Sequence, residues 1–361
     1  MSRRLASVIL CLCFLLSACA YAEAKAYILM DYETGRVLME KNADQRLPIA
    51  STTKIMTCLL ALENCTLSEK VTASKNASGV PGTSIYLSVG ETLSMEDMLY
   101  GLMLRSGNDA AVAIAEHISL SSKAFSELMN ARAQVLGADA YFTTPNGLDE
   151  GGNGASARGI TLIAREALTH DDFRKIVSTK RKTIPWVDHE YERVLTNKNK
   201  LLTDYEGAIG VKTGFTSKAG RCLVFAAERE GLTLVGCVLN CPDWFDEAER
   251  ILDEGFERYN ACVFYEKDEK IKTVFIGGRA IEIGVKEDVK APVQEGDDIK
   301  TEIHLPDLAL PVYEGQKAGE IWITANGEKI ADFDLVCMNT EIKPSYSSAL
   351  KHVISRWTAG S

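Results

Sequence analysis

The most informative segment of the chain is Pro48-Ile49-Ala50-Ser51-Thr52-Thr53-Lys54-Ile55-Met56-Thr57. After the proline, apolar residues recur at helical spacing, at positions 55, 56, 59, 60 and 62. The spacing predicts a helix with one buried face and with Ser51 in its first turn. Exposed backbone N–H groups and the positive end of the helix dipole favour an anion at that turn.

Ser51 and Lys54 are three residues apart, so on a helix they share one face and can share a proton. A serine hydroxyl is a weak nucleophile unless a base takes its proton. A lysine can be that base if burial or cationic neighbours lower its pKa. Ser348-Ala349-Leu350-Lys351 repeats the spacing in the polar tail, and we interpret that second match as accidental.

Two motifs further along the chain set the first match apart from the second. Ser106-Gly107-Asn108 supplies a hydroxyl and an amide at a break between two predicted helices, 94–105 and 109–118. Lys212-Thr213-Gly214 ends a glycine-rich, β-prone stretch. In this order, a Ser-x-x-Lys, a Ser-x-Asn and a Lys-Thr-Gly motif are the signature of class A β-lactamases and penicillin-binding proteins.

The sequence most closely resembles the serine D-alanyl-D-alanine carboxypeptidases, the low-molecular-weight penicillin-binding proteins. Besides residues 48–57, four segments resemble the sequences of this family: Arg105-Ser106-Gly107-Asn108-Asp109-Ala110-Ala111, Thr144-Pro145-Asn146-Gly147-Leu148-Asp149, Gly210-Val211-Lys212-Thr213-Gly214-Phe215-Thr216 and, near the C-terminus, Leu310-Pro311-Val312-Tyr313-Glu314-Gly315-Gln316. Gly107 is typical of the carboxypeptidases, whereas class A β-lactamases have aspartate there.

The resemblance implies a catalytic role for three residues. Ser51 would attack the carbonyl between two D-alanines and form an acyl-enzyme, which water then hydrolyses. Lys54 would be its base, and Ser106 would pass the proton to the leaving amine. Neither a metal nor another cofactor is implied.

The resemblance also implies a substrate-binding set. Asn108 would bind the substrate amide or steady Lys54. Lys212 and Thr213 would hold the terminal carboxylate, beside Gly214. Backbone N–H groups of Ser51 and Phe215 would form the oxyanion hole. The implied partners are peptidoglycan stem peptides ending in D-Ala-D-Ala, with β-lactams as covalent inhibitors, and the implied process is cell-wall organisation and cell shape.

Two alternatives stay open at this point. A class A β-lactamase needs a glutamate in a Glu-x-x-Leu-Asn context. The segment Glu166-Ala167-Leu168-Thr169 does not have this context, and its pattern predicts that Glu166 lies on the surface of an amphipathic helix. A non-enzymatic penicillin-binding sensor or scaffold would keep the fold and lose the chemistry, although no motif has been lost. The five histidines have no Gly-x-Ser-x-Gly partner, so we interpret them as structural; the glycine-rich run 147–159 fits no nucleotide-binding motif and predicts a loop lining the active site.

The N-terminus predicts export. Arg3 and Arg4 precede an apolar run, 5–16, that is short for a membrane span, and small residues follow. We expect a signal peptide over 1–24 and a location on the outer side of the bacterial cytoplasmic membrane. Lipoprotein processing at Cys19 and an uncleaved anchor are the alternatives.

Composition and charge exclude other classes. The chain has 361 residues, of which 46% are hydrophobic and 25% charged, which is typical of about two globular domains rather than a disordered chain. The net charge of -10 becomes -11 once residues 1–24 are removed, and no basic block is present, so nucleic acid is not an expected partner.

Seven cysteines remain after residue 24, so they cannot all pair, and at least one thiol should stay free. They lie inside apolar runs, which is typical of small buried side chains. Cys237 and Cys241 lack the second pair and the nearby histidines of a zinc site. We therefore expect no metal.

The patterns predict an α/β (α+β) fold, a β-lactamase/DD-peptidase-like antiparallel sheet flanked by helices, followed by a small all-β domain. The catalytic domain is expected over 25–262, with hairpin turns at 33–35 and 230–231. Short alternating runs separated by turn residues predict a β-sandwich-like domain over 263–342. The tail, 343–361, has the spacing of an amphipathic helix, which could lie on a membrane surface or dock on the protein.

Overall fold

The computed structural model describes residues 23–148, 151–187, 189–342 and 354. These residues form two compact units. Unit 1 contains the chain up to Met30, Val37–Arg229 and Thr233–Gly255, and unit 2 contains Asp31–Arg36, Glu230–Leu232 and the chain from Phe256 onward. Three predicted segments lie outside the described residues and stay predictions. They are nearly all of the signal peptide, the second Ser-x-x-Lys match, and the tail from residue 343 apart from Ile354.

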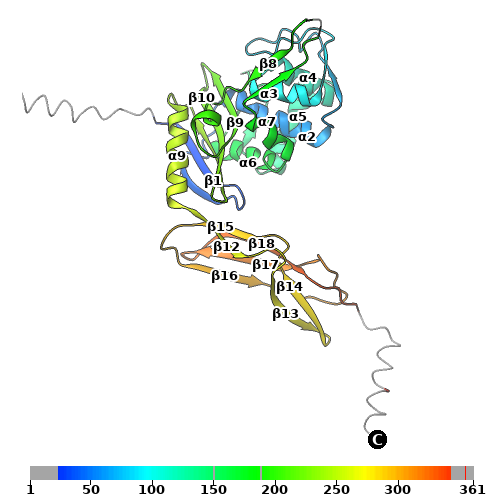
Figure 1. The fold of residues 1–361 in the computed structure, drawn as a ribbon, viewed down its shortest axis with the longest axis vertical. Helices are drawn as coiled ribbons and strands as arrows, with labels where there is room; N and C mark the ends of the chain where they lie inside the picture. The colour runs from blue at the N-terminus through cyan, green and yellow to red at the C-terminus, as the bar shows by residue number, and fades with distance from the viewer. Residues whose placement is uncertain (1–22, 149–150, 188, 343–353, 355–361) are drawn as a thin grey trace, which may run out of the picture. The chain divides into compact units, whose positions relative to one another are not determined.

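A five-stranded sheet forms the centre of unit 1, in the order β2-β1-β11-β10-β9. Its strands are β1 (Ala26–Asp31), β2 (Val37–Lys41), β9 (Ala208–Thr216), β10 (Gly220–Arg229) and β11 (Leu232–Leu239). Every residue of β11 is buried, because helices cover both faces of the sheet: α9 lies on one side and the helices around α2 and α6 lie on the other (Figure 1). Both predicted hairpins are present, and Glu230 and Gly231 have the positive φ of a tight turn.

The helical elements are η1 (Ala50–Thr53), α2 (Lys54–Asn64), α3 (Met95–Leu104), α4 (Asn108–Ser119), α5 (Ser122–Val135), α6 (Ala157–Ala167), α7 (Asp171–Ser178), α8 (Leu201–Asp204) and α9 (Trp244–Arg258). The predicted break at residues 106–108 separates α3 from α4, although Asn108 is already the first residue of α4. Ser94, the first residue of the predicted helix, caps α3, because its side chain accepts a hydrogen bond from the N–H of Asp97. Within the described part of the chain, no helix has the length and apolar character needed to cross a membrane.

Three small two-stranded antiparallel sheets complete unit 1. They are β3 (Lys70–Thr72) with β4 (Thr92–Ser94), β5 (Ala140–Tyr141) with β6 (Gly154–Ala155), and β7 (Arg181–Ile184) with β8 (Arg193–Thr196). One of them lies beside a segment that was quoted for the family resemblance, since β5 precedes Thr144, while β4 leads into α3.

Every regular element from Asn260 to Cys337 is a strand, which confirms the predicted all-β character of this region. A five-stranded sheet has the order β13-β14-β18-β17-β16, and β12 pairs with β15. Their bounds are β12 (Asn260–Tyr265), β13 (Lys270–Ile276), β14 (Arg279–Gly284), β15 (Val289–Val293), β16 (Ile299–His304), β17 (Lys317–Ala325) and β18 (Glu328–Cys337). Alternate residues such as Ile281, Ile283, Ile321 and Ile323 point into one apolar core.

None of the seven cysteines within the described residues forms a disulfide, and five of them are buried: Cys58, Cys222, Cys237, Cys241 and Cys337. Burial raises the pKa of Cys222 and of Cys241 to about 11. These thiols therefore stay protonated at neutral pH and pack as small apolar side chains, as the sequence predicts.

Candidate active site

The turn that carries Ser51 is a single 3₁₀ turn, η1, followed directly by α2. The α-helical turn expected after Pro48 is thus tighter than predicted. Ala50 has a φ of 47°, in the left-handed region, so the chain enters the turn sharply. Side chains three residues apart eclipse one another in a 3₁₀ turn. This brings Lys54 Nζ to 2.9 Å from Ser51 Oγ.

Lys54 Nζ has two further partners, Asn108 Oδ1 at 2.8 Å and the main-chain oxygen of Asn146 at 2.6 Å. Both of these oxygens can only accept hydrogen bonds. A neutral lysine amine has two N–H groups, so both are used by these acceptors. Its lone pair is then left for the hydroxyl of Ser51, which is the orientation that a general base requires.

Burial favours the neutral form of Lys54. The side chain is fully buried, and burial lowers its pKa well below the usual value. The positive charges of Lys212 and Lys198 lower that pKa further, while the carboxylate of Asp109 acts in the opposite direction. Lys198 is a contributor that the sequence analysis does not identify, because its effect depends on position in space.

The turn between α3 and α4 presents Ser106 and Asn108. Ser106 has a φ of 64°, and its hydroxyl is buried without a hydrogen-bond partner in the described structure. Thr83 donates to the main-chain oxygen of Ser106 at 2.6 Å, and the Asn108 amide donates to the Pro81 oxygen at 2.6 Å. The segment 81–83 therefore fixes this turn and leaves the Ser106 hydroxyl available for a reacting group.

Asp109 is a buried residue of this region to which the sequence analysis gives no role. Its carboxylate accepts hydrogen bonds from the Ser84 hydroxyl at 2.6 Å and from the N–H groups of Ile85 and Leu87 at 3.1 and 3.0 Å. Asp109 thereby ties the loop after Thr83 to the start of α4, the helix that positions Asn108.

Strand β9 brings the Lys-Thr-Gly motif to the same place. Lys212 is buried, and its Nζ donates to the Thr213 oxygen at 2.8 Å. Burial, together with the charge of Lys198, lowers the pKa of Lys212 to about 7. A Cβ added to Gly214 would lie 3.1 Å from the N of Ser51, so β9 passes directly beside the nucleophile. Phe215 is 63% exposed, so we expect its main chain, rather than its side chain, to contribute to the site.

The Thr144–Asp149 segment contributes backbone rather than side-chain chemistry. The sequence analysis quotes it for the resemblance only, yet the oxygen of Asn146 is a partner of Lys54. A Cβ on Gly147, whose φ is 82°, would lie 1.9 Å from the oxygen of Ala50. The predicted loop along the active site is therefore present at this end, and glycine is required for its close approach to the nucleophile turn.

Glu166 lies apart from this chemistry. It is in α6, and its carboxylate pairs with Arg132 of α5 at 2.5 Å, as a surface ion pair. It is therefore not poised as a water-activating base, in agreement with its predicted surface position. Among the described histidines, His117 contacts Glu69, His189 packs on Trp186 and His304 packs on Trp322.

Comparison with known proteins identifies the family. Residues 17–243 match the model of the D-alanyl-D-alanine carboxypeptidase family. The chain belongs to this family. Residues 259–343 of this carboxypeptidase match the C-terminal domain of penicillin-binding protein 5. Membership makes the chain a serine peptidase, a hydrolase, and confirms the resemblance noted in the sequence.

Similar proteins span nearly the whole carboxypeptidase. D-alanyl-D-alanine carboxypeptidase DacF of Bacillus subtilis is 31% identical over 357 residues, covering 93% of this chain and 90% of DacF. DacC of Escherichia coli is 33% identical, with 88% and 84% covered. The crystal structure of penicillin-binding protein 5 from Haemophilus influenzae superposes with a TM-score of 0.76 at 29% identity, covering 91% and 100%. The expected fold is thereby confirmed.

Proposed function

We propose that this carboxypeptidase removes the terminal D-alanine from peptidoglycan stem peptides through an acyl-enzyme on Ser51. The observation that carries the proposal is the hydrogen bonding of Lys54, whose Nζ lies 2.9 Å from Ser51 Oγ and has two acceptor-only partners. In the neutral amine these partners take both N–H groups, so the lone pair is left for the Ser51 hydroxyl. A nucleophile and a base within hydrogen-bond distance, with the base oriented by a third group, form the arrangement that nucleophilic catalysis needs.

In the first step, Ser51 Oγ bonds to the carbonyl carbon between the two D-alanines while its proton passes to Lys54 Nζ. The carbon–nitrogen bond then breaks. The departing amine takes a proton from Lys54 through Ser106, whose buried hydroxyl has no other partner in the described structure. Water next attacks the ester, Lys54 accepts a proton from it, and Ser51 regains its own.

Substrate binding is assigned to the strand beside the nucleophile. The protonated Lys212 and the Thr213 hydroxyl would hold the terminal carboxylate, because a charge-assisted hydrogen bond is stronger than a neutral one. The N–H groups of Ser51 and Phe215 would bind the oxyanion, an effect of about 3 kcal/mol per donor. Asn108, fixed between Lys54 and Pro81, would steady the base and meet the substrate amide.

Covalent labelling tests the nucleophile. Wild-type protein incubated with penicillin should gain the mass of one penicilloyl group and should release D-alanine from a pentapeptide, and Ser51→Ala should do neither. Ser348→Ala, at the second Ser-x-x-Lys match, is the matched control and should behave as wild type. An adduct that survives in Ser51→Ala would overturn the assignment. Fast penicillin turnover without D-alanine release would favour a β-lactamase, and an adduct without D-alanine release would favour a sensor.

We also propose that the enzyme acts outside the cytoplasm, since the N-terminus has the pattern of a signal peptide and the substrate class belongs to the cell wall. Liposome co-sedimentation with and without residues 344–361 tests whether the tail binds a membrane surface. Unchanged sedimentation after truncation would remove the membrane-surface role and leave a tail docked on the protein.

A further inference from the structure

A cluster of three metal-binding side chains lies away from the serine site, on the helical part of unit 1. Cys65 directly follows α2, Glu69 lies in the turn before β3, and His117 lies in the last turns of α4. The Cys65 sulfur, a Glu69 oxygen and a His117 ring nitrogen all lie within 4.8 Å of one another. His117 Nε2 is 3.3 Å from Glu69 Oε2.

Glu69 is held in an orientation suited to a ligand. Its Oε1 accepts hydrogen bonds from the N–H of Thr66 at 2.6 Å and from the Thr66 hydroxyl at 3.1 Å. Its main-chain oxygen accepts from the N–H of Met95 at 2.8 Å. These contacts fix the carboxylate and turn Oε2 toward His117. Supporting hydrogen bonds of this kind orient the ligands of protein metal sites.

The neighbouring acidic residue does not compete for this position. Glu116, next to His117, pairs through its two oxygens with the Ser74 hydroxyl at 2.5 Å and the Asn76 amide at 3.0 Å. The cluster therefore offers one thiol, one carboxylate oxygen and one imidazole, each on a different residue. Sulfur and nitrogen donors together with one carboxylate are a donor set that suits Zn²⁺.

We propose that Cys65, Glu69 and His117 form a binding site for a divalent transition metal of the Zn²⁺ type, with water as the fourth ligand. Ordinary zinc–ligand lengths in a tetrahedron place ligand atoms about 3.3–3.6 Å apart. The 3.3 Å between His117 and Glu69 already fits this geometry, and the sulfur needs a shift of little more than an ångström at most from its 4.8 Å limit. On binding, the thiol proton leaves to solvent and the thiolate sulfur bonds to the metal.

The sequence analysis expects no metal, because it considers only the neighbouring Cys237 and Cys241. His117 is far from Cys65 in the sequence, and only the packing of α4 beside the end of α2 brings them together. The same two helices begin at Lys54 and Asn108. A metal that joins their far ends stabilises the scaffold of the serine site without entering it.

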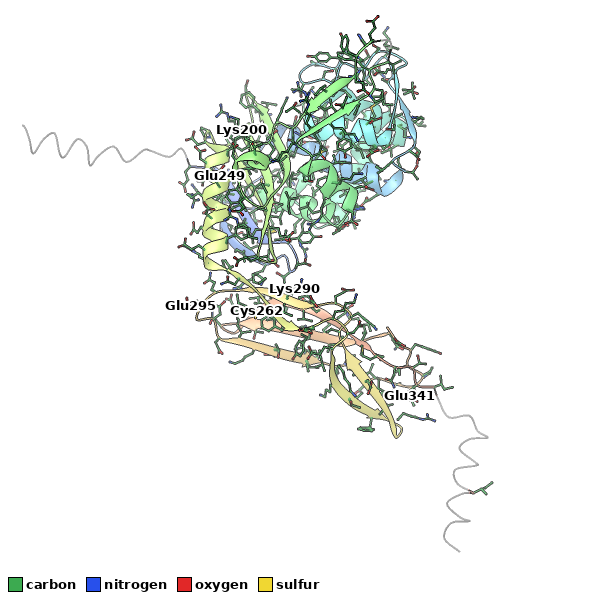
Figure 2. The ribbon with its side chains drawn as sticks, in the orientation of Figure 1. Lys200, Glu249, Cys262, Lys290, Glu295 and Glu341 are labelled. Atoms are coloured by element: carbon green, nitrogen blue, oxygen red, sulfur yellow. The ribbon has the colours of Figure 1, made fainter. Side chains whose placement is uncertain are left out.

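Cobalt titration tests the site. Untagged, metal-free protein lacking residues 1–24 should bind one equivalent of Co²⁺ under anaerobic conditions and develop the near-ultraviolet thiolate-to-cobalt absorption, which Zn²⁺ should remove. Cys65→Ser should abolish this absorption, and His117→Gln should weaken binding about tenfold or more. Cys262, labelled in Figure 2, lies on β12 and is the other partly exposed cysteine of the described residues, so Cys262→Ser is the matched control and should bind as wild type.

Penicillin acylation of each variant reports whether unit 1 is folded, since the serine site lies elsewhere. A wild-type protein that gives no thiolate absorption with Co²⁺ would refute the proposal. So would an absorption that persists in Cys65→Ser or disappears in Cys262→Ser. His117 is exposed, so His117→Gln keeps the proposal testable should Cys65→Ser fail to fold.

Discussion

Replacing Gly147 by alanine should slow acylation of Ser51 about a hundredfold, because the new Cβ would collide with the nucleophile turn. The built Cβ lies 1.9 Å from the oxygen of Ala50, whereas ordinary contact begins at 3.4 Å, so the two segments must separate by about 1.5 Å. On one side of this contact, Ala50 immediately precedes Ser51. On the other side, Asn146 immediately precedes Gly147 and supplies the main-chain oxygen that orients Lys54. The substitution therefore disturbs both the nucleophile and its base.

The magnitude follows from that displacement. A misplacement of about 1 Å in catalytic geometry costs on the order of a hundredfold in rate. A second cost falls on stability, since Gly147 has a φ of 82° and a non-glycine residue in the left-handed region costs about 1–2 kcal/mol. The two costs can be measured separately, one as an acylation rate and the other as a free energy of unfolding.

The assay is the second-order rate of acylation by a fluorescent penicillin, together with urea unfolding. Gly137→Ala is the matched control: Gly137 has a φ of 63°, and its added Cβ would meet nothing within 4 Å. It should lose only the about 1–2 kcal/mol that comes from the left-handed φ and keep the wild-type acylation rate. If Gly147→Ala is acylated within about threefold of the control, the close approach of this loop to Ser51 does not govern the chemistry, and the reasoning fails.

Three further predictions concern charge and thiols. The pKa of Lys212 is lowered to about 7, and only the protonated amine attracts a carboxylate. The kcat/KM for D-Ala-D-Ala peptides should therefore fall as pH rises through about 7. A kcat/KM that stays constant over the next two pH units would contradict this prediction. Arg193→Met should lower the free energy of unfolding in urea by about 3–5 kcal/mol, because it leaves the Glu91 carboxylate buried without its 2.9 Å partner; adding Glu91→Leu should recover part of the loss. A thiol reagent should label at most Cys65 and Cys262 in native protein lacking residues 1–24, against all seven thiols after denaturation, and rapid labelling of a third would show that a buried thiol is accessible.

Local chemistry was predictable from the sequence where neighbours in the chain are also neighbours in space. Ser51 and Lys54 are three residues apart on one turn, and the break at Ser106-Gly107-Asn108 follows from the patterns on either side of it, within one residue of the observed start of α4. The 3₁₀ form of the turn was not predictable, because it accompanies a left-handed φ at Ala50 and the close approach of Gly147 and Gly214, which are far away in the sequence.

Contacts between distant segments were the part that the sequence could not supply. The acceptor from Asn146 is a backbone oxygen, which every residue type possesses, so no side-chain pattern marks it. Lys198 acts on Lys54 and Lys212 through charge at a distance, and a lysine in a loop predicts only exposure. Helix α9 was also not identified, although its alternation of acidic and apolar residues is amphipathic.

The absence of disulfides among the seven described cysteines has a consequence for where the chain can acquire its structure. No covalent cross-link joins distant parts of the described fold, so its stability comes from packing, hydrogen bonds and ion pairs alone. Its melting temperature should therefore be the same with and without a reducing agent. The enzyme can then reach its active form without the oxidising folding machinery on which disulfide-bonded exported proteins rely.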